Sequence, residues 1–253
     1  MARVTVAVHG DLRDFLAGRD GTAPLERSVN GHPAAKDVLE SLGIPHPEIA
    51  AITVNGAPAR LGRPLRDGDH VEAWPAELAS ARGLPPAAAS PPPGEPRFVV
   101  DGHLGRLAAY LRMLGFDTWY RNDAADGHLA EVAAAEHRIL LTRDRGLLKR
   151  SLVERGAYVR SDRPVEQLAE VVRRFGLAGR WRPFGRCLRC NTPLVSATRD
   201  EVLDRLQPLT RIHYDDFRRC PGCDGVYWKG SHHARMARLV ERVGACTPGP
   251  GFP

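Results

Sequence analysis

Alternating apolar and polar residues open the chain and predict a first strand. Valines stand at every second position of residues 4–8, which is the period of a half-buried β-strand. Apolar residues then recur at helical spacing over residues 38–42, and a further strand is expected at residues 51–54, before an Asn-Gly turn. Strands on both sides of one helix predict a small ubiquitin-like β-grasp domain over residues 1–75.

Residues 76–96 are rich in Ala, Pro, Gly and Ser and have few large apolar side chains. Such a segment cannot bury a core of its own, so we expect a partly extended, semi-stiff linker. The linker is expected to separate the β-grasp domain from the rest of the chain.

Short apolar runs alternate with amphipathic helical patterns over residues 97–176. The expected strands cover residues 98–100, 117–120, 139–142 and 157–160. Apolar residues at helical spacing predict helices that begin near residues 104, 126 and 165. Repeated strand–helix units predict an α/β fold in which helices flank a parallel sheet.

The cysteine-containing region, residues 177–246, begins where this α/β pattern ends. Its last stretch, residues 231–243, carries apolar residues at helical spacing and predicts an amphipathic helix. Residues 247–253 consist mainly of Gly and Pro, and we expect them to form a disordered tail.

Aspartates follow the predicted strands of the α/β region. Asp101 comes directly after the first strand, and Asp144 lies two residues past the third. Asp123 and Asp126 stand in the loop after the second strand. Because ligands of open parallel sheets bind at the carboxyl ends of the strands, we expect these carboxylates to converge on one crevice.

A cluster of carboxylates is costly unless a cation neutralises it. Mg²⁺ or Mn²⁺ prefers oxygen ligands and can polarise a phosphoryl oxygen and activate water. Asp101, Asp126 and Asp144 are therefore candidate catalytic residues and Mg²⁺ or Mn²⁺ ligands, with Asp123 as a further candidate. Each has a structural alternative, since Asp101 suits a turn and Asp126 and Asp144 suit helix caps.

Four cysteines form two Cys-x-x-Cys pairs, Cys187 with Cys190 and Cys220 with Cys223. Each pair makes a tight turn that aims two thiolates at one point, and the pairing is typical of a zinc ribbon. Four thiolates leave no open coordination position, so we expect a structural zinc ion. A redox Cys-x-x-Cys is the alternative, but it would explain only one pair. We expect Cys246 to take no part.

The net charge of +6 is concentrated near the C-terminus, where residues 173–243 carry 15 Lys and Arg against 7 Asp and Glu. Arginine forks suit phosphate groups, so we expect RNA as a partner. The alternative is a solvated arginine-rich surface. The candidate RNA-binding residues are Arg106, Arg143, Arg145, Arg186, Arg189, Arg218, Arg219 and Lys229.

Aromatic residues stand among the basic ones near the cysteines. Exposed rings can stack on the bases of a single strand, which makes Tyr227 and Trp228 candidates for RNA contact. The alternative is that these rings form the small core of the ribbon, and we expect this for Phe184.

The sequence has no run of about 18 apolar residues, so we expect no membrane span. The first residues, MARVTVAVHGD, lack a basic segment followed by an apolar stretch, so no signal peptide is expected. The predicted location is therefore cytoplasmic.

The β-grasp region contains the pattern VNG…PLRDGDHVE, which is similar to the sulfur-carrier proteins of thiamine and molybdopterin synthesis. The resemblance implies a carrier whose working group is the carboxyl end of a terminal Gly-Gly. Here the chain continues through Trp74 and Pro75 instead, so sulfur chemistry is not expected. A docking site for a protein partner is the preferred role.

Four longer stretches carry a second resemblance: VDGHLGRLAAYLRMLGFDTWY, HRILLTRDRGLL, RPFGRCLRCNTPL and CPGCDGVYWKGSH. Together they resemble the Mut-seven C-terminal RNase family over residues 97–238, and some members of that family carry a ubiquitin-like domain like the one expected at residues 3–74. The resemblance implies a PIN-like nuclease domain followed by a zinc ribbon.

The acidic site of that family, carried over by position, implicates Asp101, Asp126 and Asp144. Gly127 departs from the pattern and leaves Asp123 and Asp126 competing for the second ligand role. The expected function is a metal-dependent endoribonuclease that hydrolyses phosphodiester bonds of single-stranded RNA, with the ribbon aiding RNA binding. The alternatives are a non-catalytic RNA-binding adaptor associated with tRNA or the ribosome, and a sulfur-carrier-related interaction protein.

Overall fold

The computed structural model describes residues 2–16, 18, 21–88 and 94–245. The chain divides into two compact units, Met1–Gly94 with Asp126–Tyr158 and Glu95–Ala125 with Val159–Pro253. The division passes through the predicted α/β region, so each portion is described with its own unit. Cys246 and the predicted tail lie outside the described residues.

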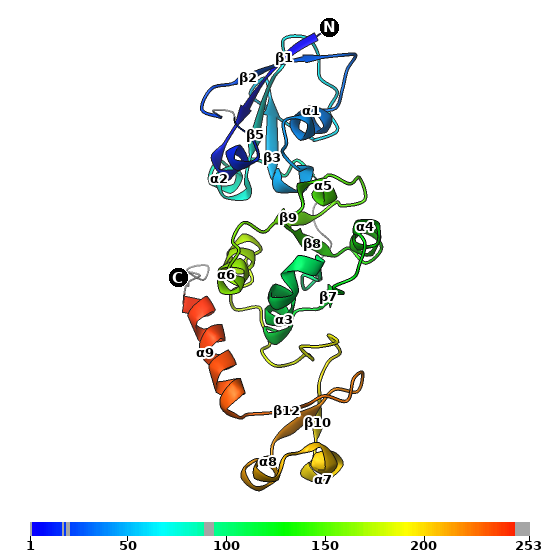
Figure 1. Ribbon diagram of the computed structural model, residues 1–253. Coiled ribbons are helices and arrows are strands. Elements are labelled where there is room, and N and C mark those ends of the chain that lie inside the picture. Colours follow the sequence, from blue (N-terminus) through cyan, green and yellow to red (C-terminus); the bar gives the residue numbers. More distant parts are fainter. Residues whose placement is uncertain (1, 17, 19–20, 89–93, 246–253) are drawn as a thin grey trace. The chain divides into compact units, whose positions relative to one another are not determined.

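The N-terminal part of the first unit is a five-stranded β-grasp sheet (Figure 1) with the order β2-β1-β5-β3-β4. Its strands are β1 (Ala2–Val8), β2 (Leu25–Val29), β3 (Ala51–Val54), β4 (Ala57–Ala59) and β5 (His70–Trp74). Strand β1 pairs antiparallel with β2 and parallel with β5. Val4 and Val6 of β1 share one buried core with Leu39 of helix α1 (Ala35–Ser41). The predicted β-grasp fold is confirmed.

Two short 3-10 helices of this domain contact the second portion of the first unit. They are η1 (Gly10–Phe15) and η2 (His46–Glu48). Phe15 is buried at the end of η1, and both His46 and Glu48 are buried in η2. Buried polar side chains require partners, and both His46 and Glu48 have a partner in the second portion of the unit.

Residues 76–88 belong to the β-grasp fold rather than to the extended linker that composition predicts. Ala76–Ala81 form helix α2. Ala87 is buried, and its backbone N–H donates to the carbonyl of Ala50 at 2.8 Å. Small side chains allow this close packing against the sheet.

The second portion of the first unit contains two helices and two strands. They are α4 (Asp126–Ala135), β8 (Ile139–Thr142), α5 (Arg145–Leu148) and β9 (Gly156–Tyr158). Strands β8 and β9 are parallel, with Thr142 opposite Tyr158. All four side chains of β8 are buried, as expected for a strand inside an α/β fold.

The second unit begins with the other parallel pair. Its elements up to residue 174 are β6 (Phe98–Val100), η3 (Gly102–Leu104), α3 (Gly105–Met113), β7 (Thr118–Tyr120) and α6 (Pro164–Arg174). Strands β6 and β7 are parallel, and α3 packs against α6. Each unit therefore holds one parallel pair of strands, β6 with β7 in the second unit and β8 with β9 in the first. The predicted parallel sheet with flanking helices is confirmed.

Gly115 ends helix α3 for two reasons. Its φ is 97°, a conformation that side chains disfavour. A β-carbon at this position would also lie 2.4 Å from the carbonyl oxygen of Arg182. The close approach brings the segment before the first cysteine pair onto the end of α3, where Arg182 N–H donates to the carbonyl of Leu114 at 2.9 Å.

The cysteine-containing region forms a small antiparallel sheet and four helical segments (Figure 1). They are β10 (Val195–Ala197), α7 (Arg199–Val202), η4 (Leu203–Arg205), α8 (Pro208–His213), β11 (Phe217–Arg219), β12 (Val226–Trp228) and α9 (Ser231–Ala245). The core of this sheet is Val202, Leu206 and Phe217. Phe184 is therefore not the core residue that the sequence predicts, because the insertion between the cysteine pairs supplies its own apolar side chains.

Helix α9 covers the predicted residues 231–243 and contacts α6. None of the helices in the described residues is both long enough and apolar enough to cross a membrane.

Candidate functional site

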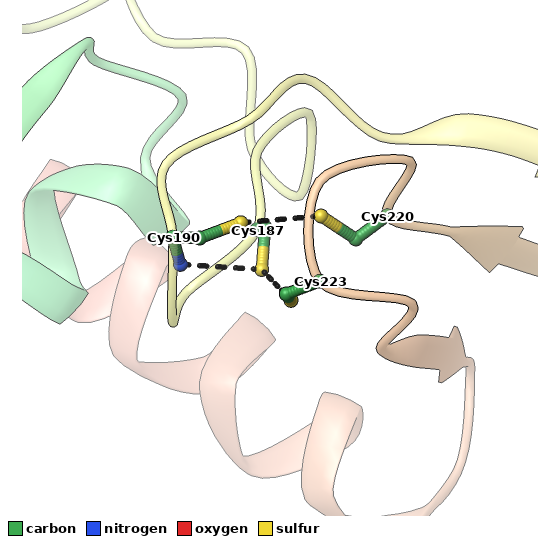
Figure 2. Close-up of side chains that lie close together, drawn as sticks. All are labelled: Cys187, Cys190, Cys220 and Cys223. Carbon is green, nitrogen blue, oxygen red and sulfur yellow. Dashed lines mark hydrogen bonds between the residues drawn. The ribbon is translucent and has the colours of Figure 1, made fainter.

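The four cysteines predicted to bind zinc meet on two facing turns, as Figure 2 shows. Their sulfur atoms all lie within 4.8 Å of one another. The sulfurs of Cys187 and Cys223 are 3.5 Å apart, and those of Cys190 and Cys220 are 3.3 Å apart. Each turn thus contributes one sulfur to each close pair, and the group can hold a metal ion.

The two turns share one backbone geometry although their sequences differ. The residue after the second cysteine, Asn191 or Asp224, has a φ of 71° or 56°. Its N–H donates to the carbonyl of the first cysteine, at 3.0 Å from Asn191 to Cys187 and 2.9 Å from Asp224 to Cys220. Asn and Asp tolerate this left-handed conformation better than other residues with side chains. Sequence reasoning missed the role of these two residues. An Asn or Asp directly after a Cys-x-x-Cys pair was the signal that could have revealed it.

Burial and hydrogen bonds set the thiol pKa values apart. Burial opposes ionisation of Cys190, but hydrogen bonds with Thr192 lower the pKa of Cys190 to about 6. The Gly225 amide lowers the pKa of Cys223, whereas burial and the neighbouring thiols raise it, to about 12 in all. Accumulating thiolate charge at one point is costly, and a bound cation removes that cost.

The sulfur positions fit a tetrahedral ion. Zinc binds thiolates at about 2.3 Å, which places the sulfurs of a tetrahedral site about 3.8 Å apart. The observed spacings of 3.5 Å and 3.3 Å are close to this edge length. A soft tetrahedral set of four sulfurs is also the donor set that zinc prefers.

Tyr227 lies at this centre rather than on an exposed surface. Its hydroxyl is 3.0 Å from the Cys187 sulfur and accepts a hydrogen bond from the Leu188 N–H at 3.2 Å. The neighbouring Trp228 is 38% exposed. Of the two predicted stacking rings, only Trp228 therefore presents a large free area.

A buried arginine joins the first turn to the α/β elements of the same unit. Arg112 of α3 is 4% exposed. It donates to the carbonyls of Thr118, Leu188 and Arg189 at 2.9, 3.1 and 2.9 Å. Burial lowers the pKa of Arg112, while the nearby thiols of Cys187 and Cys190 oppose that change. Sequence reasoning missed this residue.

Asn191 makes a second link between the turn and strand β7. Its side chain donates to Asp117 Oδ1 at 2.8 Å and accepts from the Thr118 N–H at 3.0 Å. Asp117 also pairs with Arg97 at 3.4 Å. Asp117 therefore has a structural role just before β7, where it joins the first cysteine turn to Arg97.

Two of the predicted catalytic carboxylates, Asp101 and Asp123, lie in the second unit. Asp101 follows β6 directly, is 8% exposed, and accepts the Leu104 N–H with its backbone carbonyl at 2.9 Å. Asp123 is exposed and forms two hydrogen bonds with Arg121, at 3.2 and 3.1 Å. Arg121 holds the pKa of Asp123 below its ordinary value. Burial therefore distinguishes the two carboxylates, since Asp101 is nearly enclosed and Asp123 is exposed.

The other two predicted carboxylates, Asp126 and Asp144, lie in the first unit. Helix α4 begins at Asp126, whose side chain is exposed in the first turn. Asp144 caps α5, because its Oδ1 accepts from the N–H groups of Gly146 at 2.6 Å and Leu147 at 3.3 Å. Both bonds use the same oxygen, so the cap does not employ Oδ2.

The predicted RNA-binding residues fall into two groups. Arg106, Arg143 and Arg189 are exposed. The guanidinium groups or amines of the others contact protein groups: Arg145 with Asp14 and Phe15, Arg186 with Gly115 and Asn191, Arg218 with Phe184, Arg219 with Asp224, and Lys229 with Asp216. Surface ion pairs such as the last two open at little cost.

The β-grasp region is similar to solved structures of small proteins. SAMP1 from Haloferax volcanii is 20% identical, with 29% of this chain and 94% of that chain covered and a TM-score of 0.24. A protein assigned as molybdopterin converting factor, subunit 1, from Pyrococcus furiosus is 19% identical, with 30% and 98% covered and a TM-score of 0.25. No curated protein matches the chain.

Family models match the chain in two places. The model of the Mut7-C RNase domain matches residues 96–240, which is more than half of the chain. The model of the Mut7-C ubiquitin domain matches residues 1–81. Both matches agree with the resemblance carried by the sequence phrases. The chain therefore belongs to the Mut7-C RNase family, with the ubiquitin-like domain of that family at its N-terminus.

Proposed function

We propose that this protein is a metal-dependent endoribonuclease that hydrolyses phosphodiester bonds of single-stranded RNA. The observation that carries the proposal is the match of residues 96–240 to the Mut7-C RNase domain. The position of Asp101 directly after a parallel strand, and of Asp144 two residues past another, adds support.

In this proposal Asp101, Asp126 and Asp144 hold Mg²⁺ or Mn²⁺, and Asp123 is the alternative to Asp126. The divalent ion supplies charge neutralisation and polarisation at the scissile phosphate. The buried Asp101 provides a carboxylate shielded from solvent, which strengthens its attraction for a cation. Asp144 keeps Oδ2 outside its capping bonds, so helix capping and ion binding are compatible. Exposed Arg106 and Arg143 bind the flanking phosphates.

The cysteine centre is proposed to be a structural zinc site that holds RNA-binding residues in place. Its four thiolates complete a tetrahedral shell and leave no position for substrate. Arg189 is exposed within the first turn, and Lys229 directly follows the exposed Trp228, the last residue of β12. Phosphate contact by basic residues and base stacking on a ring together suit a single strand. The proposed location in the cell is the cytoplasm.

Cleavage of a mixed-sequence single-stranded RNA, with and without Mn²⁺, tests the proposal. The wild-type protein should cleave only with the ion, and Asp101→Asn should reduce the rate at least about a hundredfold because a metal ligand is lost. Asp204→Asn, which removes an exposed carboxylate of the ribbon, is the matched control and should cleave normally. Equal cleavage by Asp101→Asn and wild type contradicts the mechanism.

A non-catalytic RNA-binding adaptor is the second candidate. The observations that favour it are the local roles of Asp123 and Asp144, one paired with Arg121 and the other capping a helix. Under this alternative RNA binding survives chelation and the aspartate substitutions, and no cleavage occurs at any ion concentration. The β-grasp domain is proposed to dock a protein partner. Sulfur transfer has no support, because the chain continues past β5 into helix α2.

A further inference from the structure

Arg145 stands next to the proposed catalytic Asp144, yet its guanidinium is directed to the β-grasp domain. Nη1 donates to the carbonyl of Phe15 at 3.3 Å, and Nη2 donates to the carbonyl of Asp14 at 3.2 Å. The guanidinium carbon lies 5.0 Å from the ring centre of Phe15 and 5.5 Å from that of Tyr158. Two carbonyl acceptors and two aromatic rings therefore surround the guanidinium and hold it in place.

The opposite end of helix α5 is attached to the same domain. Lys149 follows the last helical residue, and its Nζ donates to the carbonyl of Glu40 at 2.8 Å. Leu147 and Leu148 are buried between the two cationic anchors. A helix of four residues has almost no stability of its own, so these tertiary contacts are what define its position.

Strand β9 is held by the β-grasp domain as well. The buried Glu48 accepts the backbone N–H of Tyr158 at 2.6 Å. His46 lies with one ring nitrogen 2.7 Å from Glu40 Oε1 and the other 2.7 Å from the carbonyl of Val153. These hydrogen bonds hold the strand in one position against the β-grasp domain, because moving it would leave buried polar groups unpaired.

We propose that the β-grasp domain positions helix α5, and that Arg145 acts as a positioning residue for Asp144 rather than as an RNA ligand. The inference rests on the proposed role of Asp144 in the nuclease. Arg145 is the first residue of α5 and Asp144 is its cap, so the guanidinium contacts hold in place the helix end that carries the carboxylate. The ubiquitin-like domain is thereby part of the nuclease architecture and not only a recruiting module.

The test compares Arg145→Met, Arg145→Lys and Arg143→Ala in the full chain. Arg145→Met keeps the apolar stem and loses the fork, and Arg145→Lys keeps the charge. Hydrogen exchange is measured at the amides of Gly146 and Leu147, which donate to Asp144. RNA cleavage gives kcat and KM separately.

Arg145→Met should speed exchange at both amides about tenfold or more and lower kcat about tenfold with KM within about twofold of wild type. Arg145→Lys should recover part of both effects. Arg143→Ala should raise KM and leave exchange unchanged. Unchanged exchange in Arg145→Met, or a rise in KM without a fall in kcat, overturns the positioning role.

The exchange measurement separates this inference from the nuclease proposal. If wild-type protein does not cleave RNA, the proposed function fails, while exchange still reports whether the β-grasp domain holds α5. If wild type cleaves and exchange is unaffected by Arg145→Met, the nuclease proposal stands and the positioning inference falls.

Discussion

The cysteine centre and the proposed carboxylate site differ in how their residues are brought together. The four cysteines lie within one unit on two hydrogen-bonded turns, and their sulfurs are already within 4.8 Å of one another. The carboxylates are divided, with Asp101 and Asp123 in one unit and Asp126 and Asp144 in the other. The three exposed carboxylates also take part in local structure. Asp126 begins helix α4, Asp144 caps α5, and Asp123 pairs with Arg121.

The difference shows what two kinds of sequence evidence can establish. A Cys-x-x-Cys pair encodes a local turn, so its geometry follows from a few neighbouring residues. An aspartate after a strand encodes only a position in the topology, and its side chain can serve a cap, an ion pair or a metal ion. We expect the two sites to differ also in what they contribute, the cysteine centre to stability and the carboxylate site to chemistry.

The largest effect is expected from loss of Cys220, one of the four proposed zinc ligands. This sulfur is fully buried, and structural zinc sites contribute on the order of 10 kcal/mol to folding. Cys220→Ser should therefore lose bound zinc and unfold β11 and β12, while the β-grasp domain keeps its structure. Zinc content by metal analysis and amide exchange of the two regions measure this.

Thr192→Val is the matched control for Cys220→Ser, since it removes a hydroxyl near the centre but no ligand. It should keep zinc at the wild-type ratio. Retention of zinc and of a folded ribbon by Cys220→Ser would show that the thiols do not form a structural zinc site.

The second prediction separates the two roles of Asp144. Serine is a good helix cap but has no carboxylate, so Asp144→Ser should retain thermal stability and lose cleavage by about a hundredfold or more. Asp144→Ala should lose the same activity and about 1 kcal/mol of stability as well. Thermal unfolding and single-turnover cleavage are the measurements. Full activity in Asp144→Ser would leave the carboxylate with a capping role alone.

Sequence patterns predicted those helices, strands and turns that are determined by neighbouring residues. The residues of β6 and β8 agree with the expected bounds, because continuous apolar runs identify buried strands. The two cysteine turns were likewise predictable from a few residues. Composition wrongly predicted an extended linker at residues 76–88. These small residues form no core of their own, but they pack against the β-grasp domain.

The parts that the sequence did not reveal depend on contacts between distant residues. Arg112 donates to a carbonyl 77 residues away, and Arg145 donates to one 131 residues away. The periodicity of apolar residues predicts that an arginine near an apolar stripe is exposed. The pattern contains no information about hydrogen-bond acceptors that lie far along the chain. The acceptors of Arg112 and of Arg145 were not predicted for this common reason.

The third prediction concerns the attachment of the cysteine centre to α3. Arg112→Met should destabilise the protein by about 2–4 kcal/mol, because it removes the donor to the buried carbonyl of Thr118 and to two partly buried carbonyls. Arg106→Met, on the exposed face of the same helix, should change stability by less than about 0.5 kcal/mol. Denaturant unfolding followed by circular dichroism measures both. Equal stabilities of the two variants would show that the centre does not need this link.

The smallest effect is expected for Asp69, a carboxylate with a structural role and no proposed chemistry. It accepts from the Arg66 N–H at 2.9 Å and from the Asn55 side chain at 2.8 Å. The Arg66 bond in particular holds the pKa of Asp69 below its ordinary value. These bonds favour the charged form, so their contribution is present above the ordinary pKa of an aspartate and is lost as the pH falls through the lower, folded-state value.

Stability of the β-grasp domain should therefore decline by about 1 kcal/mol over this acidic range, and Asp69→Asn should remove that part of the decline. Amide exchange or denaturant unfolding from pH 6 down to about pH 2 follows it. Asp37→Asn, which alters an exposed carboxylate of α1, should leave the acid dependence unchanged. An identical acid profile for Asp69→Asn and wild type would mean that paired carboxylates in this domain act through net charge. The contrast between structural and chemical aspartates would then rest on Asp144 alone.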